Sequence, residues 1–349
     1  MSPLNRQNRA NNFNLLRLLF AVLVLLSHSF ELVDGDRSRE LLTSVFHTLT
    51  FGEFAVDGFF LLSGYLIVQS WQLSPRMGSF LKKRILRIYP GFIAASIICT
   101  FVVAPLGSIL EHYPFSFTTW QFIENTLSFG NPLTGEVFLG QYYPWVNGAL
   151  WTISWEAKCY IAVLLIGLVG GVRNRQVWFV LTLAALIVFL CQKFGFVLKV
   201  HGSAFAREDA ARFASLFFVG GSFYLYRDKI MFEQKWLVAS ALSLAGLMFS
   251  NQLAELALAI FGGYLLFYFA FKPSPFLAGF LKFPDVSYGV YLYGWPIQKL
   301  ILWYFPSARP WTLFAFSCCA AVVCGLISWY VIEKPFLKLK SLSWKIKPI

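Results

Sequence analysis

The stretch RLLFAVLVLLSH, residues 17–28, carries a charged Arg17 and a titratable His28 at the two ends of an apolar run. In an α-helix, eleven steps of about 100° bring both side chains onto one stripe, about 16 Å apart along the axis. An ionisable group that faces lipid costs several kcal/mol, so we expect this stripe to face the interior of a helix bundle. The rest of the chain has to supply that bundle.

The composition is that of a membrane protein. Of the 349 residues, 58% are hydrophobic and only 13% are charged, far from the balance of soluble domains. Apolar stretches of about 15–22 residues, long enough to cross a bilayer as helices, recur along the whole length. We predict an all-α fold, a polytopic transmembrane helix bundle of about ten spans, forming a single domain over residues 1–349. The stretches are 15–30, 52–71, 88–105, 149–170, 176–192, 212–226, 236–250, 254–271, 286–305 and 311–332.

The basic residues indicate how the chain is oriented. With the N-terminus in the cytoplasm, most of the 29 Lys and Arg residues fall in inner segments, which is the positive-inside pattern. We expect both termini to be cytoplasmic and the chain to cross the cytoplasmic (inner) membrane many times. The net charge of +12 then reflects attraction to headgroups, so membrane lipid is an expected partner and nucleic acid is not. The inner segments are 1–17, 72–88, 171–176, 227–235, 272–283 and 333–349.

We expect neither a metal site nor a disulfide. The six cysteines all fall in predicted spans, and none forms a CxxC pair or a metal-ligand spacing. One long extramembrane segment, residues 106–148, contains no Lys or Arg and is rich in aromatic residues and proline. This composition is typical of a re-entrant or lid-like loop on the outer surface.

His28 lies near the outer end of the first predicted span, and Asp57 lies about five residues into the second span from the same side. Asp57 can therefore accept a hydrogen bond from one nitrogen of the His28 imidazole. The other nitrogen would then act as a base. The alternative is a histidine solvated among the lipid headgroups.

Glu156 lies in the stretch LWTISWEAKCY, about 10 Å below the outer surface if this stretch is helical. An unpaired carboxylate at that depth is costly, so Glu156 has to be paired, protonated or functional. Arg212, at the outer end of a later span, is a candidate partner. An ion pair that holds two helices together is thus the alternative to a catalytic role.

On the cytoplasmic side, the stretch FLKKRILRIYP places Lys83, Arg84 and Arg87 ahead of the third span. Arg84 and Arg87 are three residues apart and share a helix face, and guanidinium forks match phosphate oxygens. The pattern indicates a site for a nucleotide-bearing cofactor, whereas positive-inside anchoring explains part of the charge. The small residues of FFLLSG, residues 59–64, favour close helix packing over ligand binding.

Taken together, these stretches resemble the acyltransferase-3 family of integral membrane acyltransferases. The resemblance rests on an ordered set of motifs that spans essentially the whole chain. In one of them, many members have a histidine where this chain has Gly294, so any role of that histidine is absent here. The motifs are Arg17 with His28, FFLLSG at 59–64, RILRIYP at 84–90, LWTISWE at 150–156, SYGVYLYGWPIQ at 287–298 and EKPF at 333–336.

The resemblance implies transfer of an acyl group, commonly acetyl, from a coenzyme A thioester to a hydroxyl of a glycan or related acceptor. It implies thioester chemistry at Arg17 and His28. It also implies contact with the cofactor at Arg84 and Arg87, and we add Lys83 to this cofactor set. Some members carry a fused extracytoplasmic esterase-like domain, which we do not expect here.

Our hypothesis is a membrane O-acyltransferase with acetyl-CoA or another acyl-CoA as donor and no metal. His28 is the expected base, or the nucleophile if a covalent acyl-histidine forms. Arg17, Asp57 and Glu156 are the further catalytic candidates.

The acceptor is expected to be a glycan or a lipid-linked sugar. Trp151, Trp155 and Tyr143 are the candidate acceptor-binding residues, because aromatic rings stack on sugar rings. A belt of aromatic residues at the membrane interface is the alternative explanation for them. The alternative function is a polytopic transporter or flippase for a polar or glycan substrate, in which the same polar residues line a path.

Overall fold

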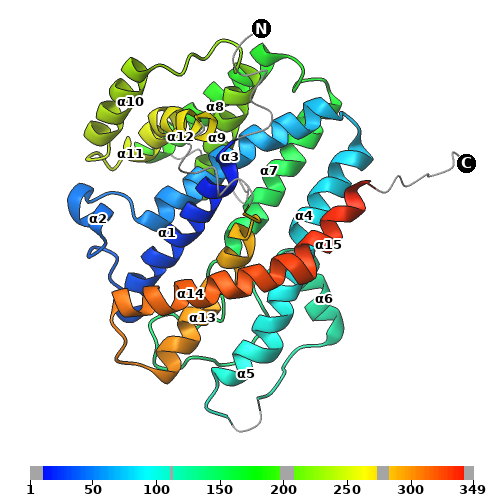
Figure 1. The fold of residues 1–349 in the computed structure, drawn as a ribbon, viewed down its shortest axis with the longest axis vertical. Coiled ribbons are helices and arrows are strands. Elements are labelled where there is room, and N and C mark those ends of the chain that lie inside the picture. Colours follow the sequence, from blue (N-terminus) through cyan, green and yellow to red (C-terminus); the bar gives the residue numbers. More distant parts are fainter. Residues whose placement is uncertain (1–10, 111–112, 197–207, 273–282, 342–349) are drawn as a thin grey trace, which may run out of the picture. The chain divides into compact units, whose positions relative to one another are not determined.

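The structure is a computed structural model that describes residues 11–110, 113–196, 208–272 and 283–341. Within these ranges the chain is helical and contains no strand, which confirms the predicted all-α class (Figure 1). The first half contains α1 (Phe13–Asp34), α2 (Leu41–Phe46), α3 (Phe51–Leu73), α4 (Met77–Ile98), the π-helical turn η2 (Cys99–Val103), α5 (Ala104–Leu106), α6 (Thr119–Leu127) and α7 (Trp151–Leu168). The second half contains α8 (Arg175–Lys193), α9 (Glu208–Leu225), α10 (Gln234–Leu247), α11 (Ala254–Ala257), the π-helical turn η4 (Leu258–Gly262), α12 (Gly263–Phe271), α13 (Ser287–Tyr304), α14 (Pro310–Ser328), the π-helical turn η7 (Trp329–Glu333), α15 (Lys334–Lys338) and the 3₁₀ turn η8 (Leu339–Ser341).

Seven helical segments of the described chain are long and apolar enough to cross a membrane, so this is a multi-pass membrane protein. Each apolar stretch of the sequence coincides with a helix. Three of those helices, α9, α10 and α13, are shorter or more polar than the seven. The seven segments are Phe13–Asp34, Phe51–Leu73, Met77–Leu106, Trp151–Leu168, Arg175–Lys193, Ala254–Phe271 and Pro310–Lys338.

The chain folds as two compact units. Unit 1 consists of Met1–Glu31, Asp36–Pro75 and Trp155–Phe283. Unit 2 consists of Leu32–Gly35, Arg76–Ser154 and Pro284–Ile349.

In unit 1, α3 packs along α9, and α9 packs along α8 (Figure 1). Glycines bring the backbones of α3 and α9 close together. A Cβ atom added at Gly64 would lie 2.0 Å from the carbonyl oxygen of Phe217, and one added at Gly220 would lie 2.0 Å from that of Leu61. The prediction that FFLLSG serves helix packing is therefore confirmed.

The start of α3 is fixed by a reciprocal cap. The hydroxyl of Thr50 accepts a hydrogen bond from the backbone N–H of Glu53 at 3.1 Å, and the Glu53 carboxylate accepts one from the Thr50 N–H at 2.8 Å. This capping box satisfies two donors that a helix N-terminus leaves open. It sets where the FFLLSG helix begins.

In unit 2, α13 packs along α14, and α4 packs against α13, η7 and α15. The α13–α14 pair again meets at glycine, because a Cβ atom added at Gly289 would lie 2.7 Å from the Cα atom of Gly325. In its described residues after α5, the predicted long outer segment contains the helix α6 and irregular chain. Its end is attached to α13, since the Asn147 side-chain amide donates to the carbonyl of Leu292 at 2.9 Å.

Candidate active site

His28 lies near the end of α1, on the same helix as Arg17, as the sequence predicts. Its Nδ1 atom is 3.0 Å from Oε2 of Glu31, about one turn further along the helix. The His28 side chain is 16% exposed and that of Glu31 is 3% exposed. When Nδ1–H donates to this carboxylate, Nε2 carries the lone pair that a general base needs.

The sequence reasoning missed Glu31, although Glu31 follows His28 by three residues in the sequence. Residues three apart on a helix are neighbours, and a carboxylate at that distance from a histidine is a local signal. The second carboxylate oxygen of Glu31 also has a partner, because the Arg37 guanidinium donates to it. Glu31 therefore lies between the imidazole and a cation, which holds it ionised and in place.

A second carboxylate supports the end of α1. Ser27 donates to one oxygen of Glu40 at 2.6 Å, and the backbone N–H of Phe51 donates to the other at 2.8 Å. Burial raises the pKa of the Glu40 carboxyl, and these two hydrogen bonds partly offset that effect. The contacts connect the residue before His28 to the start of α3.

The prediction that Asp57 orients His28 is wrong in this structure. Asp57 is fully buried, and its Oδ1 accepts a hydrogen bond from Nε of Arg212 on α9 at 2.9 Å. The physical reason is charge: a buried carboxylate is stabilised more by a guanidinium than by a neutral imidazole. Because Glu31 holds His28 from the same helix, the imidazole does not need Asp57.

Arg212 is the centre of a larger buried ionic network within unit 1. Its Nε atom is also 3.1 Å from Oε1 of Glu255 on α11, and its Nη2 donates to the carbonyl of Glu53 at 3.3 Å. Oε2 of Glu255 is in turn 2.5 Å from Nζ of Lys193 at the end of α8. Two carboxylates and two cations thus compensate one another and join helices α3, α8, α9 and α11.

Glu156 does not pair with Arg212, the partner considered from the sequence. Its Oε1 atom accepts hydrogen bonds from the hydroxyl of Ser63 at 2.7 Å and from that of Tyr160 at 2.6 Å. Ser63 belongs to FFLLSG and Glu156 to LWTISWE, so two of the sequence motifs meet at this carboxylate. The pairing within unit 1 satisfies Glu156 without a cation.

Arg87 on α4 is held by two carboxylates within unit 2. Its Nη2 is 2.6 Å from Oδ2 of Asp285, and its Nη1 is 3.7 Å from Oε2 of Glu333, the last residue of η7. Asp285 also accepts a hydrogen bond from Ser287 at 2.5 Å. Two motifs, RILRIYP and EKPF, therefore meet at one guanidinium, and SYGVYLYGWPIQ joins the same cluster through the contact of Ser287 with Asp285. Sequence reasoning missed Asp285. Glu333 could have been considered, because it is the first residue of the EKPF motif.

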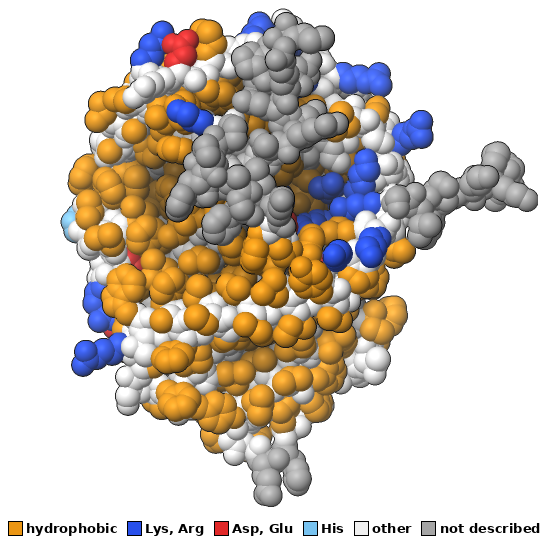
Figure 2. Space-filling model, viewed as in Figure 1, with side chains coloured by type: hydrophobic (Ala, Val, Ile, Leu, Met, Phe, Trp, Pro, Cys, Tyr) orange, Lys and Arg blue, Asp and Glu red, His pale blue; other side chains and the backbone are white. Residues whose placement is uncertain are grey.

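Lys83 and Arg84 lie on α4 beside this cluster in sequence, and both side chains are partly exposed. The Arg84 guanidinium also lies 5.8 Å from the centre of the Phe80 ring. Figure 2 shows Lys and Arg side chains gathered over α4 and α15, two helices of unit 2 that pack together. This basic surface contains Lys82, Lys83 and Arg84 of α4 and Lys334 and Lys338 of α15.

The three predicted acceptor-binding aromatic residues have different surroundings. Trp151, at the start of α7, is 40% exposed. Trp155 is buried, and the Lys158 ammonium lies 3.7 Å from its ring centre. Tyr143 is half-buried, and its ring lies 6.1 Å from that of Trp295 on α13. Trp151 and Tyr143 thus keep some exposed surface, whereas Trp155 is engaged in packing.

Among the residues that the structure describes, no group of three or more His, Cys, Asp or Glu side chains is placed to hold a metal ion. The six cysteines are free thiols.

Comparison with known proteins gives matches over nearly the whole chain. Residues 11–330 match the family profile described as "Acyltransferase domain". An "O-acetyl transferase" of Shigella phage Sf6 is 26% identical, with 96% of this chain and 98% of that protein covered. "Nodulation protein 10" of Rhizobium leguminosarum bv. viciae is 27% identical, with 98% of this chain and 97% of that protein covered. No solved structure matches the chain.

Proposed function

The chain belongs to the acyltransferase-3 family of membrane acyltransferases, and we propose that it transfers an acyl group, most simply acetyl, from cytoplasmic acyl-CoA to a hydroxyl of a glycan or lipid-linked sugar. The similarity to a protein named O-acetyl transferase supports an oxygen acceptor and an acetyl group. The observation that carries the proposal is the contact between His28 and Glu31, which prepares an imidazole for base chemistry at the end of a membrane helix.

In the proposed reaction, Nε2 of His28 removes the proton from the acceptor hydroxyl. The oxygen attacks the thioester carbonyl, a new C–O ester bond forms, the C–S bond breaks, and the CoA thiolate leaves and takes up a proton. Glu31 stabilises the imidazolium that forms in this step. Arg17 is proposed to assist at the thioester, and Glu156, held by Ser63 and Tyr160, to support the polar interior of unit 1.

For the donor, we propose that Arg84 and Lys83 bind the phosphates of acyl-CoA. Both side chains are cationic and can therefore bind the anionic phosphates, and both are partly exposed on the basic surface of unit 2. Arg87 was predicted to share this role. Because Asp285 and Glu333 already surround its guanidinium, we propose that it anchors α4 instead.

The proposed membrane arrangement has ten spans in the cytoplasmic (inner) membrane, with both termini in the cytoplasm. The seven long apolar segments, together with α9, α10 and α13, provide that number. The concentration of basic residues in the inner segments supports the orientation. The family match runs through both units, which supports one acyltransferase domain.

The proposal is tested with the purified full-length protein in nanodiscs. Acetyl-CoA and a cell-surface glycan fraction are added, and released CoA thiol and acetylated glycan are measured together. We expect both products from the wild type and a loss of about 10²–10⁴ in rate for His28→Ala. Near-normal transfer by His28→Ala, or glycan uptake into vesicles that needs no acyl donor, would contradict the proposal; the latter result would identify a transporter.

A further inference from the structure

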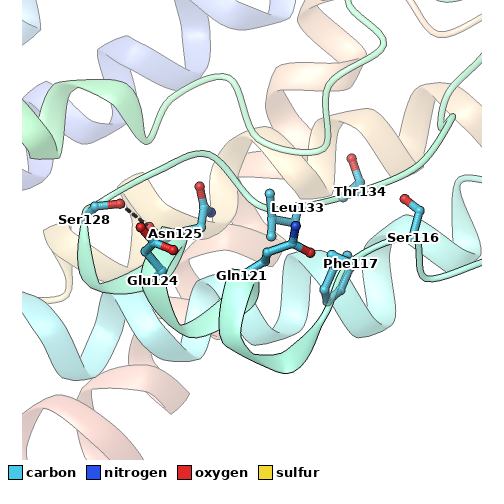
Figure 3. A pocket seen from close by; sticks show the side chains of 8 residues that line it. All are labelled: Ser116, Phe117, Gln121, Glu124, Asn125, Ser128, Leu133 and Thr134. Carbon is cyan, nitrogen blue, oxygen red and sulfur yellow. Dashed lines mark hydrogen bonds between the residues drawn. The ribbon is translucent and has the colours of Figure 1, made fainter.

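A surface pocket of about 410 Å³ lies in the outer segment, between α6 and the chain on either side of it (Figure 3). Its volume falls in the range of roughly 300–1,000 Å³ that is usual for small-molecule sites. Every lining residue belongs to unit 2, and no step proposed above uses any of them. The lining residues are Ser116, Phe117, Gln121, Glu124, Asn125, Ser128, Leu133 and Thr134.

Two amide side chains of this lining are fixed in orientation by contacts with the chain around them. The side-chain oxygen of Gln121 accepts hydrogen bonds from the backbone N–H and the hydroxyl of Thr118, so its NH₂ group remains as a donor. The side-chain NH₂ of Asn125 donates to the carbonyl of Asn131 at 2.7 Å, so its oxygen remains as an acceptor. The pocket therefore offers one oriented donor and one oriented acceptor, the pairing that vicinal hydroxyls satisfy.

Phe117 adds an apolar surface whose position is fixed. Its ring contacts those of Phe101, Phe115 and Phe122 at centre-to-centre distances of 6.2, 6.0 and 6.0 Å. A ring supported by three others loses little conformational entropy when it binds a ligand. The C–H face of a sugar is a suitable partner for such a surface.

The charge of the lining limits the ligand further. Among the described residues that line the pocket, Glu124 is the only ionisable one, and the sequence of 106–148 contains no Lys or Arg. A phosphate or carboxylate ligand would meet the negative charge of Glu124 and no Lys or Arg of this segment, which is unfavourable. A neutral polyhydroxyl ligand instead gains an anionic acceptor, and hydrogen bonds to charged groups are the stronger ones.

We infer that this pocket is a binding subsite for a neutral sugar ring of the acceptor, with Gln121, Glu124 and Asn125 binding hydroxyls and Phe117 contacting the ring face. The inference rests on the proposed function for the identity of the acceptor. It adds to that function the place where the acceptor sugar binds and the preference for an uncharged sugar ring.

The test measures binding without any acyl donor. The full-length protein in nanodiscs is titrated with methyl glycosides of neutral hexoses and N-acetylhexosamines, and with methyl glucuronide, by ligand-observed NMR. We expect at least one neutral glycoside to bind at least about threefold more tightly than glucuronide. Phe117→Ala and Gln121→Ala should each raise its Kd about threefold or more, and Glu124→Gln should narrow the difference from glucuronide.

Matched controls exist in the same segment. Trp120 is 69% exposed, lies on α6 and does not line the pocket, so Trp120→Ala should leave the Kd unchanged; Glu136→Gln is the control for Glu124→Gln. The inference is overturned if the wild type binds none of the neutral glycosides, or if the pocket variants bind them as the wild type does. CoA release is assayed on the same samples: acyl transfer without pocket-dependent binding contradicts only this inference, and the reverse result contradicts only the proposed function.

Discussion

The contact between Glu31 and Nδ1 of His28 determines which nitrogen of the imidazole carries the hydrogen. A carboxylate in this position favours the Nδ1–H tautomer and stabilises the imidazolium that forms when Nε2 takes up a proton. Arg37 keeps Glu31 ionised, because a guanidinium beside a carboxylate favours its charged form. In the proposed reaction, Glu31 is therefore a positioning residue that acts through His28.

Replacing Glu31 by Gln should lower kcat at least about tenfold, with a small change in the KM for acyl-CoA. The amide keeps the shape of the side chain but loses the charge that stabilises the imidazolium. Because the imidazolium that forms during the reaction loses its paired carboxylate, the acidic limb of the pH–rate profile should move to lower pH. The measurement is the pH dependence of CoA release by purified protein.

Asp36→Asn is the control, since Asp36 is an exposed carboxylate in the loop that follows α1. It should leave both kcat and the pH profile as in the wild type. Glu31→Asp, which restores the charge, should recover part of the activity. A Glu31→Gln protein whose pH profile matches the wild type would show that Glu31 only supports the fold.

How far side-chain partners can be predicted depends on their distance along the chain. The pairing of His28 with Glu31 is local, so spacing alone is sufficient to find it. The partner of Asp57 is 155 residues away, and spacing cannot choose between Arg212 and His28 for a buried carboxylate. The cost of burying charge predicts that a partner exists, and only the fold identifies it.

Among the helices, the close contact of α3 with α9 depends on the missing side chain of Gly64. Gly64→Ala would place a Cβ atom 2.0 Å from a backbone oxygen of α9, and a backbone cannot rotate away as a side chain can. We expect a loss of about 1–3 kcal/mol or more in stability, measured as a lower Tm in detergent.

Gly246→Ala is the matched substitution on α10, where an added Cβ atom meets no atom within 4 Å. Because alanine is the better helix former, the Tm should stay constant or rise slightly. Equal Tm values for Gly64→Ala and the wild type would show that α3 and α9 do not depend on this contact.

Alanine should affect different properties at Arg84 and at Arg87, although the two residues are only three positions apart on α4. Arg87→Ala removes the cation between two buried carboxylates, Asp285 and Glu333, and should cost about 3–5 kcal/mol of stability. Arg84→Ala should leave the Tm unchanged and raise the KM for acyl-CoA. Thermal unfolding and steady-state kinetics of the two variants measure this difference. A raised KM for acyl-CoA with an unchanged Tm for Arg87→Ala would show that Arg87 binds the cofactor and does not anchor α4.

Hydropathy was sufficient to locate the helices, because a run of apolar residues has few other stable structures in a bilayer. It was not sufficient to pair them. The glycines of FFLLSG predict a close helix contact but do not say that α9 provides it. The π-helical turn that ends at Glu333 has no signal in the sequence, yet this residue contacts Arg87.

For the chain as a whole, the distribution of charge is the property that sets orientation. Basic residues are concentrated in the predicted inner segments, whereas the segment 106–148 contains none. Cationic loops are retained on the cytoplasmic side during insertion. The proposed reaction depends on this asymmetry, because the donor is made in the cytoplasm and the proposed sugar subsite lies in 106–148.

Cysteine labelling tests this orientation. In a variant without the six native cysteines, Glu136→Cys and Asp228→Cys place one thiol in the predicted outer segment and one between α9 and α10. In intact spheroplasts, a membrane-impermeant maleimide should label position 136 and should reach position 228 only after permeabilisation, because 227–235 is a predicted inner segment rich in Lys and Arg. Acyl transfer by each variant before labelling controls for folding. Labelling of position 228 from outside would reverse the orientation and place the sugar subsite in the cytoplasm, where a glycan acceptor would have to be modified before export.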